Sequence, residues 1–272
     1  MKLHQKRLQR DLARAVAPSL SHAIFFLGAT NPIRKLVAFM NYLLGRGSGM
    51  GWALESEVAA AINCIKRADP IVFDVGANIG EWSRHYRELT GSGLLFMFEP
   101  QPACQDAIIS KNIINSQLVR SAVGNQTGAM KLYTSSPTDG SASLHERHDS
   151  FFDELTYEAI DVEVLSLDDF IKQQNLDFID FIKFDIEGHE LDALKGLMKA
   201  LTAGKIGALS FEFGSGNLNS GTCFRDFWKL LHKQYHISVI TPSGRLREIT
   251  SYYEDEEFYR GVSNFIAELK RR

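Results

Sequence analysis

The stretch D-V-G-A-N-I-G, residues 74–80, follows the apolar run Ile71–Phe73 and precedes a helix-like segment. Its two glycines let the backbone turn tightly and approach a ligand closely, and the next helix presents free N–H groups there. The spacing is neither the G-x-G-x-x-G of dinucleotide-binding folds nor a phosphate-binding G-K-[ST] loop. The carboxylate of Asp74 would repel a pyrophosphate but can pair with a cationic amino-acid group. The stretch therefore favours S-adenosylmethionine (SAM) over an ordinary glycine-rich turn.

Helix-like and strand-like segments alternate from about residue 55 onward. Apolar strands separated by helices indicate a parallel sheet covered on both faces. Segments 129–133 and 160–165 instead alternate in the manner of antiparallel strands, which predicts a β insertion over residues 125–165. The expected helices are 55–66, 80–89, 102–115, 167–174, 189–201 and 223–234. The expected strands of the main sheet are 71–74, 94–98, 118–122, 179–185, 206–213, 236–241 and 262–268.

Two polar residues lie at expected strand ends beside the glycine turn. Glu99, in F-E-P at 98–100, follows the turn by about 20 residues, where a carboxylate can bind both hydroxyls of a ribose. Ser121, in S-A-V-G at 121–124, would border the adenine. The expected cofactor-binding residues are therefore Asp74, Gly76, Ala77, Asn78, Gly80, Glu99 and Ser121.

The segment K-F-D-I-E-G-H-E, residues 183–190, brings Asp185, Glu187 and His189 to the start of a helix at the same sheet edge. The helix dipole favours carboxylates there, and an ordinary helix cap would account for only one of them. Glu212 lies between two phenylalanines at the next strand end. We expect these four residues to be catalytic. They would also suit a divalent ion such as Mg²⁺, although their spacing matches no recognised metal motif.

Together, D-V-G-A-N-I-G, F-E-P and K-F-D-I-E-G-H-E resemble the FkbM family of SAM-dependent methyltransferases over roughly residues 70–240. The resemblance implies an α/β class I methyltransferase fold, which is Rossmann-like and three-layered. Its sheet would be mostly parallel and seven-stranded, with one reversed strand at an edge. The resemblance also implies O-methyl transfer, often to a hydroxyl of a sugar or polyketide. It places Asp74, Gly76, Asn78, Gly80 and Glu99 against SAM, and Asp185, Glu187 and His189 near the transferred methyl.

The implied reaction is an in-line displacement in which a hydroxyl attacks the sulfonium methyl. Positioning contributes most, and a base removes the hydroxyl proton as the new bond forms. We expect His189 to be this base because an unperturbed imidazole titrates near neutrality. Asp185 or Glu187 would then orient His189 or hold an ion.

Charge is distributed unevenly along the 272 residues. The chain is 44% hydrophobic and 23% charged, with a net charge of −3, which excludes a disordered chain. Residues 1–50 carry eight Lys/Arg and one acid, a net +7, whereas the remainder carries 22 Lys/Arg and 32 acids, a net −10. A glycine-rich break at 45–51 divides a basic helical extension, residues 1–50, from a SAM-binding methyltransferase domain, residues 51–272.

The N-terminal extension, residues 1–50, is expected to form two helices. Pro18 is expected to stop or kink the first, and Asn31-Pro32 to begin the second. A basic amphipathic helix suits peripheral contact with an anionic membrane or a lipid-linked glycan. The alternative, favoured by a modest amphipathic pattern, is that the extension packs on the sheet layer or covers the site.

Three function classes fit these observations. The leading one is a SAM-dependent O-methyltransferase acting on a sugar, glycan or other small molecule. A non-catalytic SAM-binding assembly or regulatory module would not need the acids at Asp185, Glu187 and Glu212. A nucleic-acid or protein methyltransferase is disfavoured by the acidic body, so no nucleic-acid partner is expected. Three scattered cysteines and the lack of a secretory signal predict a cytoplasmic protein, membrane-peripheral if the extension binds lipid. The oligomeric state is left open.

Overall fold

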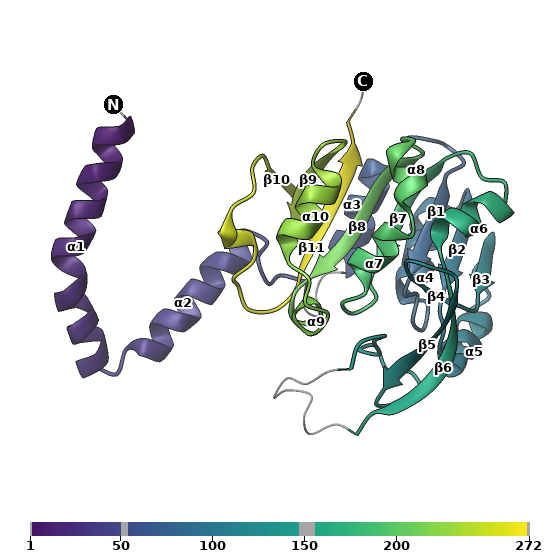
Figure 1. Cartoon of the computed structure of the whole chain (residues 1–272), viewed down its shortest axis with the longest axis horizontal. Coiled ribbons are helices and arrows are strands. Elements are labelled where there is room, and N and C mark those ends of the chain that lie inside the picture. Colours follow the sequence, from purple (N-terminus) through teal and green to yellow (C-terminus); the bar gives the residue numbers. More distant parts are fainter. Residues whose placement is uncertain (1, 50–53, 147–155, 271–272) are drawn as a thin grey trace. The chain divides into compact units, whose positions relative to one another are not determined.

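The computed structural model describes residues 2–49, 54–146 and 156–270 (Figure 1). The chain forms two compact units, Met1–Asn41 and Tyr42–Arg272, which are described separately. The backbone N–H of Gly47 donates to Ser263 Oγ at 2.7 Å and Arg46 Nη2 lies 2.9 Å from Glu256 Oε1, so residues just after the first unit belong to the body. The expected boundary at 50/51 falls on residues outside this description and stays a prediction.

The first unit consists of helix α1 (Lys2–Phe26) and most of helix α2 (Thr30–Leu43). Helix α1 continues through Pro18, so the proline does not stop it. Pro18 is exposed, and water can solvate the carbonyl that it leaves unbonded. In the described residues no single helix has the length and apolar content to cross a membrane. Segments Arg14–Phe26 and Thr30–Leu43 have this length and apolar content only when they are taken together. The chain bends by 116° between them.

The second unit contains an eight-stranded sheet in the order β10-β9-β11-β8-β7-β1-β2-β3. Five neighbouring strands run parallel, and β11 is antiparallel to both β8 and β9. The predicted α/β fold with a mostly parallel sheet is confirmed. The strands are β1 (Ile71–Val75), β2 (Leu94–Phe98), β3 (Ser116–Val119), β7 (Ile179–Phe184), β8 (Ile206–Phe213), β9 (Tyr235–Ile240), β10 (Leu246–Ile249) and β11 (Ser263–Leu269).

The sheet departs from the sequence-based expectation at one edge. It has eight strands rather than seven, and the reversed strand β11 lies inside the sheet, while the edge is formed by β10. A tight turn in which Thr241 N–H bonds to the Arg245 carbonyl folds β10 back onto β9. The sequence L-R-E-I of β10 is too short and too polar to read as a strand of the core.

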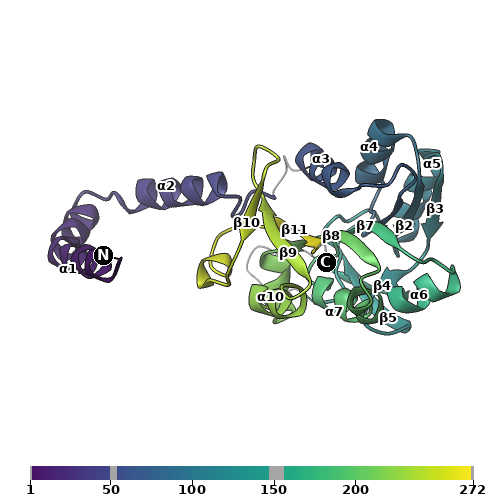
Figure 2. The ribbon, with the colours of Figure 1, turned by 90° about the horizontal axis from the view of Figure 1, so that it is seen from above.

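Helices cover both faces of the sheet and give three layers (Figure 2). Alternate strand residues point to opposite faces, so that Val72 packs in one apolar core and Phe73 in the other. The first core involves α3 (Leu54–Cys64), α4 (Glu81–Thr90) and α5 (Pro102–Ser110). The second core involves α6 (Leu167–Gln173), α7 (Glu190–Lys195), α8 (Met198–Thr202) and α10 (Phe224–Leu231). The predicted helix 189–201 is thus two short helices.

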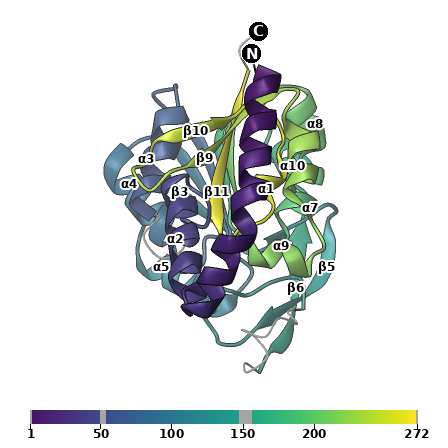
Figure 3. The ribbon, with the colours of Figure 1, turned by 90° about the vertical axis from the view of Figure 1, so that its left-hand side faces the viewer.

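The predicted β insertion is a three-stranded sheet with the order β4-β6-β5. Its strands are β4 (Ala122–Val123), β5 (Gly128–Thr134) and β6 (Glu158–Leu165). Strands β5 and β6 form a ribbon that projects beyond the main sheet (Figure 3). The strand expected at 118–122 is divided between β3 and β4, which belong to different sheets.

Gly196, after α7, packs directly against the insertion. A Cβ atom at Gly196 would lie 2.1 Å from the carbonyl oxygen of Gly124, next to β4. We expect Gly196→Ala to lower the free energy of unfolding by about 1–3 kcal/mol, because the two backbones would have to separate. Gly128→Ala is the control, since a Cβ there meets no atom within 4 Å, and its effect should stay within about 0.5 kcal/mol. Equal urea midpoints for the two variants would contradict this account.

Candidate active site

Sheet register brings the polar residues that follow four strands to one edge. Val75 of β1 pairs with Phe98 of β2 and with Phe184 of β7. Phe184 also pairs with Phe211 of β8. The residues just beyond these positions, which include the glycine turn, Glu99, Asp185 and Glu212, therefore gather at the carboxyl ends of parallel strands. Open α/β sheets bind ligands at this edge.

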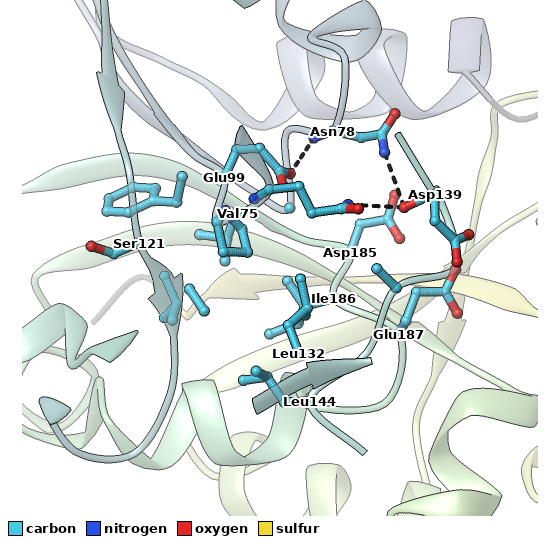
Figure 4. Close-up of a pocket in the computed structure, with 18 residues that line it drawn as sticks. Val75, Asn78, Glu99, Ser121, Leu132, Asp139, Leu144, Asp185, Ile186 and Glu187 are labelled. Carbon is cyan, nitrogen blue, oxygen red and sulfur yellow. Dashed lines mark hydrogen bonds between the residues drawn. The ribbon is translucent and has the colours of Figure 1, made fainter. Parts of the chain in front are cut away.

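An open cavity of about 580 Å³ lies at this edge and is called the first cavity (Figure 4). One wall is polar and comes from the turns after β1, β2 and β7. The opposite wall is apolar and comes from the insertion. Its mixed polar and apolar lining is typical of sites for small molecules and cofactors. The lining includes Gly76, Asn78, Glu99, Gln101, Ser121, Leu132, Asp139, Leu144, Asp185 and Glu187.

The glycine turn passes very close to the end of β7. Gly76 has a φ of 84°, and a Cβ there would lie 1.8 Å from the carbonyl oxygen of Asp185. The N–H groups of Gly76 and Ala77 both donate to the carbonyl of Phe98, at 3.0 and 3.1 Å. Only glycine fits at position 76, as the motif predicts. The close crossing fixes the position of Asp185 relative to the turn.

Glu99 is buried in the polar wall, where its carboxylate organises two loops. Its Oε2 accepts the backbone N–H of Asn78 at 2.8 Å, and its Oε1 accepts that of Gln101 at 2.8 Å. Burial raises the pKa of Glu99 to about 7, although these hydrogen bonds act in the opposite direction. Each carboxylate oxygen keeps a further lone pair for a ligand hydroxyl. This placement suits the predicted ribose contact.

Asp139, in the insertion loop, was not anticipated from the sequence. Its backbone carbonyl accepts Gln101 Nε2 at 2.9 Å and Asn78 Nδ2 at 3.4 Å, which ties the loop to the polar wall (Figure 4). Burial acts to raise the pKa of Asp139, but hydrogen bonds from Ser135 and Ser141 outweigh it and lower the pKa. The run S-S-P-T-D-G-S indicates a turn, but its spacing does not reveal the contacts of Asp139 with Gln101 and Asn78.

A second cavity of about 820 Å³ lies beside the glycine turn. Its lining includes Glu57 from α3, Trp82 from α4, and Lys183 and Glu212 from the strands. Gly76, Asn78 and Asp185 line both cavities, so they mark the junction between them.

Lys183, like Asp139, was not anticipated from the sequence. Its ammonium group is a buried cation at this junction. Its Nζ lies 2.9 Å from Asp185 Oδ2 and 3.5 Å from Asp74 Oδ1. Burial alone would lower the pKa of Lys183, but Asp185 and Asp74 raise it, so the ammonium stays charged. Ser83 Oγ donates to Asp74 Oδ2 at 2.6 Å. The carboxylate of Asp74 is thus engaged within the protein and lines neither cavity, and its contact with the cofactor stays a prediction.

The carboxylates of Asp185, Glu187 and Glu212 lie close together at this edge of the sheet. One oxygen each from Asp185, Glu187 and Glu212 lies within 4.8 Å of the others, a donor set that suits a hard divalent ion. Burial, followed by repulsion from Asp185 and Glu187, raises the pKa of Glu212 well above its usual range. Burial likewise raises the pKa of nearby Glu57 to about 7.

His189, the expected catalytic base, lies outside both cavities. It is buried, and its Nδ1 lies 2.9 Å from His145 Nε2. Burial, followed by repulsion from His145, lowers the pKa of His189 to about 4. The reason is local: Gly188 adopts a φ of 102°, and the buried Glu190 accepts its N–H and that of Ile186. This turn directs the imidazole toward the insertion.

The predicted cofactor residues therefore fall into three groups. Gly76, Asn78, Glu99 and Ser121 line the first cavity. Ala77 lines the second cavity. Asp74 and Gly80 line neither. Gly80 precedes α4 with a φ of 82°, so its role in the structure is to turn the chain into the helix.

The parallel sheet, its internal reversed strand, the glycine turn after β1 and the acid after β2 define a class I methyltransferase fold. The Methyltransferase FkbM domain model matches residues 74–236, which is more than half of the chain. The chain belongs to this family.

Individual relatives share limited identity. The 2-O-methyltransferase NoeI of Sinorhizobium fredii is 27% identical over 153 residues, which cover 52% of this chain and 63% of NoeI. The hexuronic acid methyltransferase AglP of Haloferax volcanii is 26% identical over 196 residues, which cover 71% of this chain and 70% of AglP. The solved precorrin-6y C5,15-methyltransferase from Geobacter metallireducens is 13% identical, with a TM-score of 0.39, covering 78% of this chain and 87% of that one.

The Lys183 ion pairs can be tested by comparison with an exposed pair. We expect Lys183→Met to lower the free energy of unfolding by about 3–5 kcal/mol, because Asp74 would be left as an unpaired buried carboxylate. In the control pair, Lys131 Nζ lies 2.9 Å from Asp161 Oδ1 and both side chains are more than half exposed. Lys131→Met should change stability by less than about 1 kcal/mol. Urea denaturation at pH 7 measures both, and similar losses would refute the distinction.

Proposed function

We propose that this protein transfers a methyl group from SAM to a hydroxyl of a sugar, glycan or other small molecule. The observation that carries the proposal is the junction at Asp185, where a cavity suited to a nucleoside cofactor meets a second cavity lined by carboxylates. When bound, SAM supplies an electrophilic methyl group on its sulfonium. The protein's own part is to hold the two reactants in line and to accept a proton.

The first cavity fits the cofactor by the chemistry of its walls. Glu99 would accept the ribose hydroxyls, and Ser121 with the apolar insertion wall would border the adenine. Gly76 lets the glycine turn pass so close to the end of β7 that no other side chain would fit there. Asp185 and Asn78 would hold the amino-acid end near the junction. The apolar side chains of Leu132 and Leu144 exclude water from this wall.

Glu212 replaces His189 as the proposed base. It lines the second cavity, where the acceptor would enter, and its raised pKa suits acceptance of a proton from a hydroxyl. Asp185 is paired with Lys183, which holds its carboxylate in place and suits a positioning role. The proton would pass from the acceptor oxygen to Glu212 as that oxygen attacks the methyl.

A hydroxyl-rich acceptor is supported by two independent points. The second cavity offers several carboxylate acceptors for hydroxyl hydrogen bonds, and its acidic lining disfavours a polyanion such as a nucleic acid. In addition, the relatives NoeI and AglP are named for 2-O-methyl transfer and for a hexuronic acid. A non-catalytic SAM-binding module remains the contrasting hypothesis.

Activity and its pH dependence test the proposal together. Purified protein, SAM and a panel of sugars, glycans, RNA and proteins should yield S-adenosylhomocysteine and a one-methyl mass increase in a sugar or glycan. Because the base must be ionised, kcat should rise with pH through the raised pKa of Glu212 and then level off. Glu212→Gln should lower kcat at least about 100-fold and abolish that rise, with little change in SAM affinity.

The control variant is Glu248→Gln. Glu248 is an exposed residue of the edge strand β10, and its Oε1 lies 2.9 Å from Nδ1 of His236 on β9. It should keep the wild-type rate and pH profile. Full activity of Glu212→Gln would exclude Glu212 as the base. SAM binding without product from any acceptor would support the binding module instead.

We also propose that the protein is cytoplasmic and membrane-peripheral, with its N-terminal extension on an anionic lipid surface. Residues 1–50 combine eight Lys/Arg with a single acid. Helix α2 buries none of its side chains, and the apolar side chains of Phe25 and Phe26 are 75% and 85% exposed. Basic charge beside exposed aromatic groups is typical of helices that lie in the membrane interface.

Liposome flotation of the full chain tests this localisation. We expect binding to vesicles with anionic lipid, weaker binding to zwitterionic vesicles, and weakening at high salt. Replacing both Phe25 and Phe26 by Ser should reduce the lipid-bound fraction at least about tenfold, because two aromatic groups would no longer be buried. Leu218→Ser, at a 76% exposed site of the body, is the control and should bind as the wild type does. Equal flotation of the double variant would reject the proposal.

A further inference from the structure

Two histidines and an aspartate form a cluster outside both cavities. His145 belongs to the insertion loop, while His189 and Asp192 belong to the start of α7. His189 Nδ1 lies 2.9 Å from His145 Nε2 and 3.8 Å from Asp192 Oδ2. One ligand atom from each of the three residues lies within 4.8 Å of the other two. The cluster therefore joins two segments that are 44 residues apart.

The donor atoms and their spacing match a transition-metal site. Zn²⁺ binds imidazole nitrogen and carboxylate oxygen at about 2.0–2.2 Å, so ligand atoms around a tetrahedral ion are roughly 3.3 Å apart. Small side-chain rotations would bring the observed distances to that value. Two imidazoles and one carboxylate favour zinc and related ions over Mg²⁺, which prefers oxygen ligands only.

The surroundings hold the ligand atoms in place. His189 is 4% exposed, and its Nδ1 is directed toward His145 and Asp192. Its Nδ1 faces the nitrogen of another imidazole, so without an ion one ring must donate N–H to the other. The Oδ1 of Asp192 binds Lys195 Nζ at 2.7 Å, which leaves Oδ2 directed to His189.

We propose that His145, His189 and Asp192 bind one divalent transition-metal ion, for which Zn²⁺ is the best match. Three protein ligands leave a position for water. The ion would join the insertion loop to the turn after β7 and would take no part in methyl transfer, since none of its ligands lines either cavity.

The position of the cluster gives the ion a structural task. Leu144 and Glu187, which line the first cavity, are one and two residues from the ligands His145 and His189. Ser143 Oγ already donates to the Glu187 carbonyl at 2.8 Å between the same two segments. A bound ion would therefore fix the separation of two walls of the first cavity. Metal binding itself does not depend on the proposed function.

Metal binding to the full-length protein, stripped with a chelator, tests the proposal. Zn²⁺ alone should bind with one equivalent per chain and raise the melting temperature, and Co²⁺ should give a visible absorption band of low-symmetry coordination. His145→Ala should weaken Zn²⁺ binding at least about 100-fold and remove the thermal shift. Asp192→Asn, a nearly isosteric change, should weaken binding by a smaller factor. Mg²⁺ at the same concentration should leave the melting temperature unchanged.

Two controls separate this cluster from other metal-binding groups. His236→Ala removes an exposed imidazole that also lies 2.9 Å from a carboxylate, and it should bind Zn²⁺ as the wild type does. Glu212→Gln weakens the acidic cluster and should likewise leave this binding unchanged. If the wild type takes up no Zn²⁺, or if His145→Ala binds it equally, the proposal is overturned and the imidazole pair is an N–H···N hydrogen bond only.

Discussion

The buried ammonium of Lys183, held between Asp74 and Asp185, is the interaction on which the site depends. A buried charge is costly unless partners surround it, so the three groups must stay together in the folded protein. Because Asp74 belongs to β1 and Asp185 follows β7, the cation fixes these two strand ends relative to each other. It also keeps one carboxylate in place at the junction of the two cavities. The close crossing at Gly76 depends on the same alignment.

The insertion completes a site that the main sheet only begins. The sheet edge alone supplies polar groups that are open to water. Asp139 binds Gln101 and Asn78 through its carbonyl, and the apolar Leu132 and Leu144 then face the polar wall. A nucleoside needs both surfaces, since hydroxyls require acceptors and a base requires an apolar contact. No site residue was expected in the insertion, yet it forms the apolar wall of the first cavity.

The sequence predicts which residues reach this edge of the sheet, because that follows from their position in the chain. It does not predict the direction in which each side chain points. Residues after parallel strands must meet at one edge, which places Glu99, Asp185 and Glu212 correctly. The direction of the His189 side chain depends on the positive φ of Gly188 and on the hydrogen bond from the Gly188 N–H to the Glu190 carboxylate. No sequence motif reveals either feature. Asp139 and Lys183 were missed because their partners are distant in sequence or on another strand. The edge strand β10 escaped notice because its burial is slight.

The environments of the carboxylates divide their roles. Asp185 faces the cation Lys183, whereas the charges that act most strongly on Glu212 are all negative, from Asp185, Glu187 and Glu57. Asp185 thus has a cationic partner, whereas burial and repulsion make its neighbour Glu212 a better proton acceptor. Enzymes commonly divide acid and base roles between adjacent groups by placing them in different environments. The same difference in environment argues against a purely structural cluster, because the repulsion on Glu212 lowers stability.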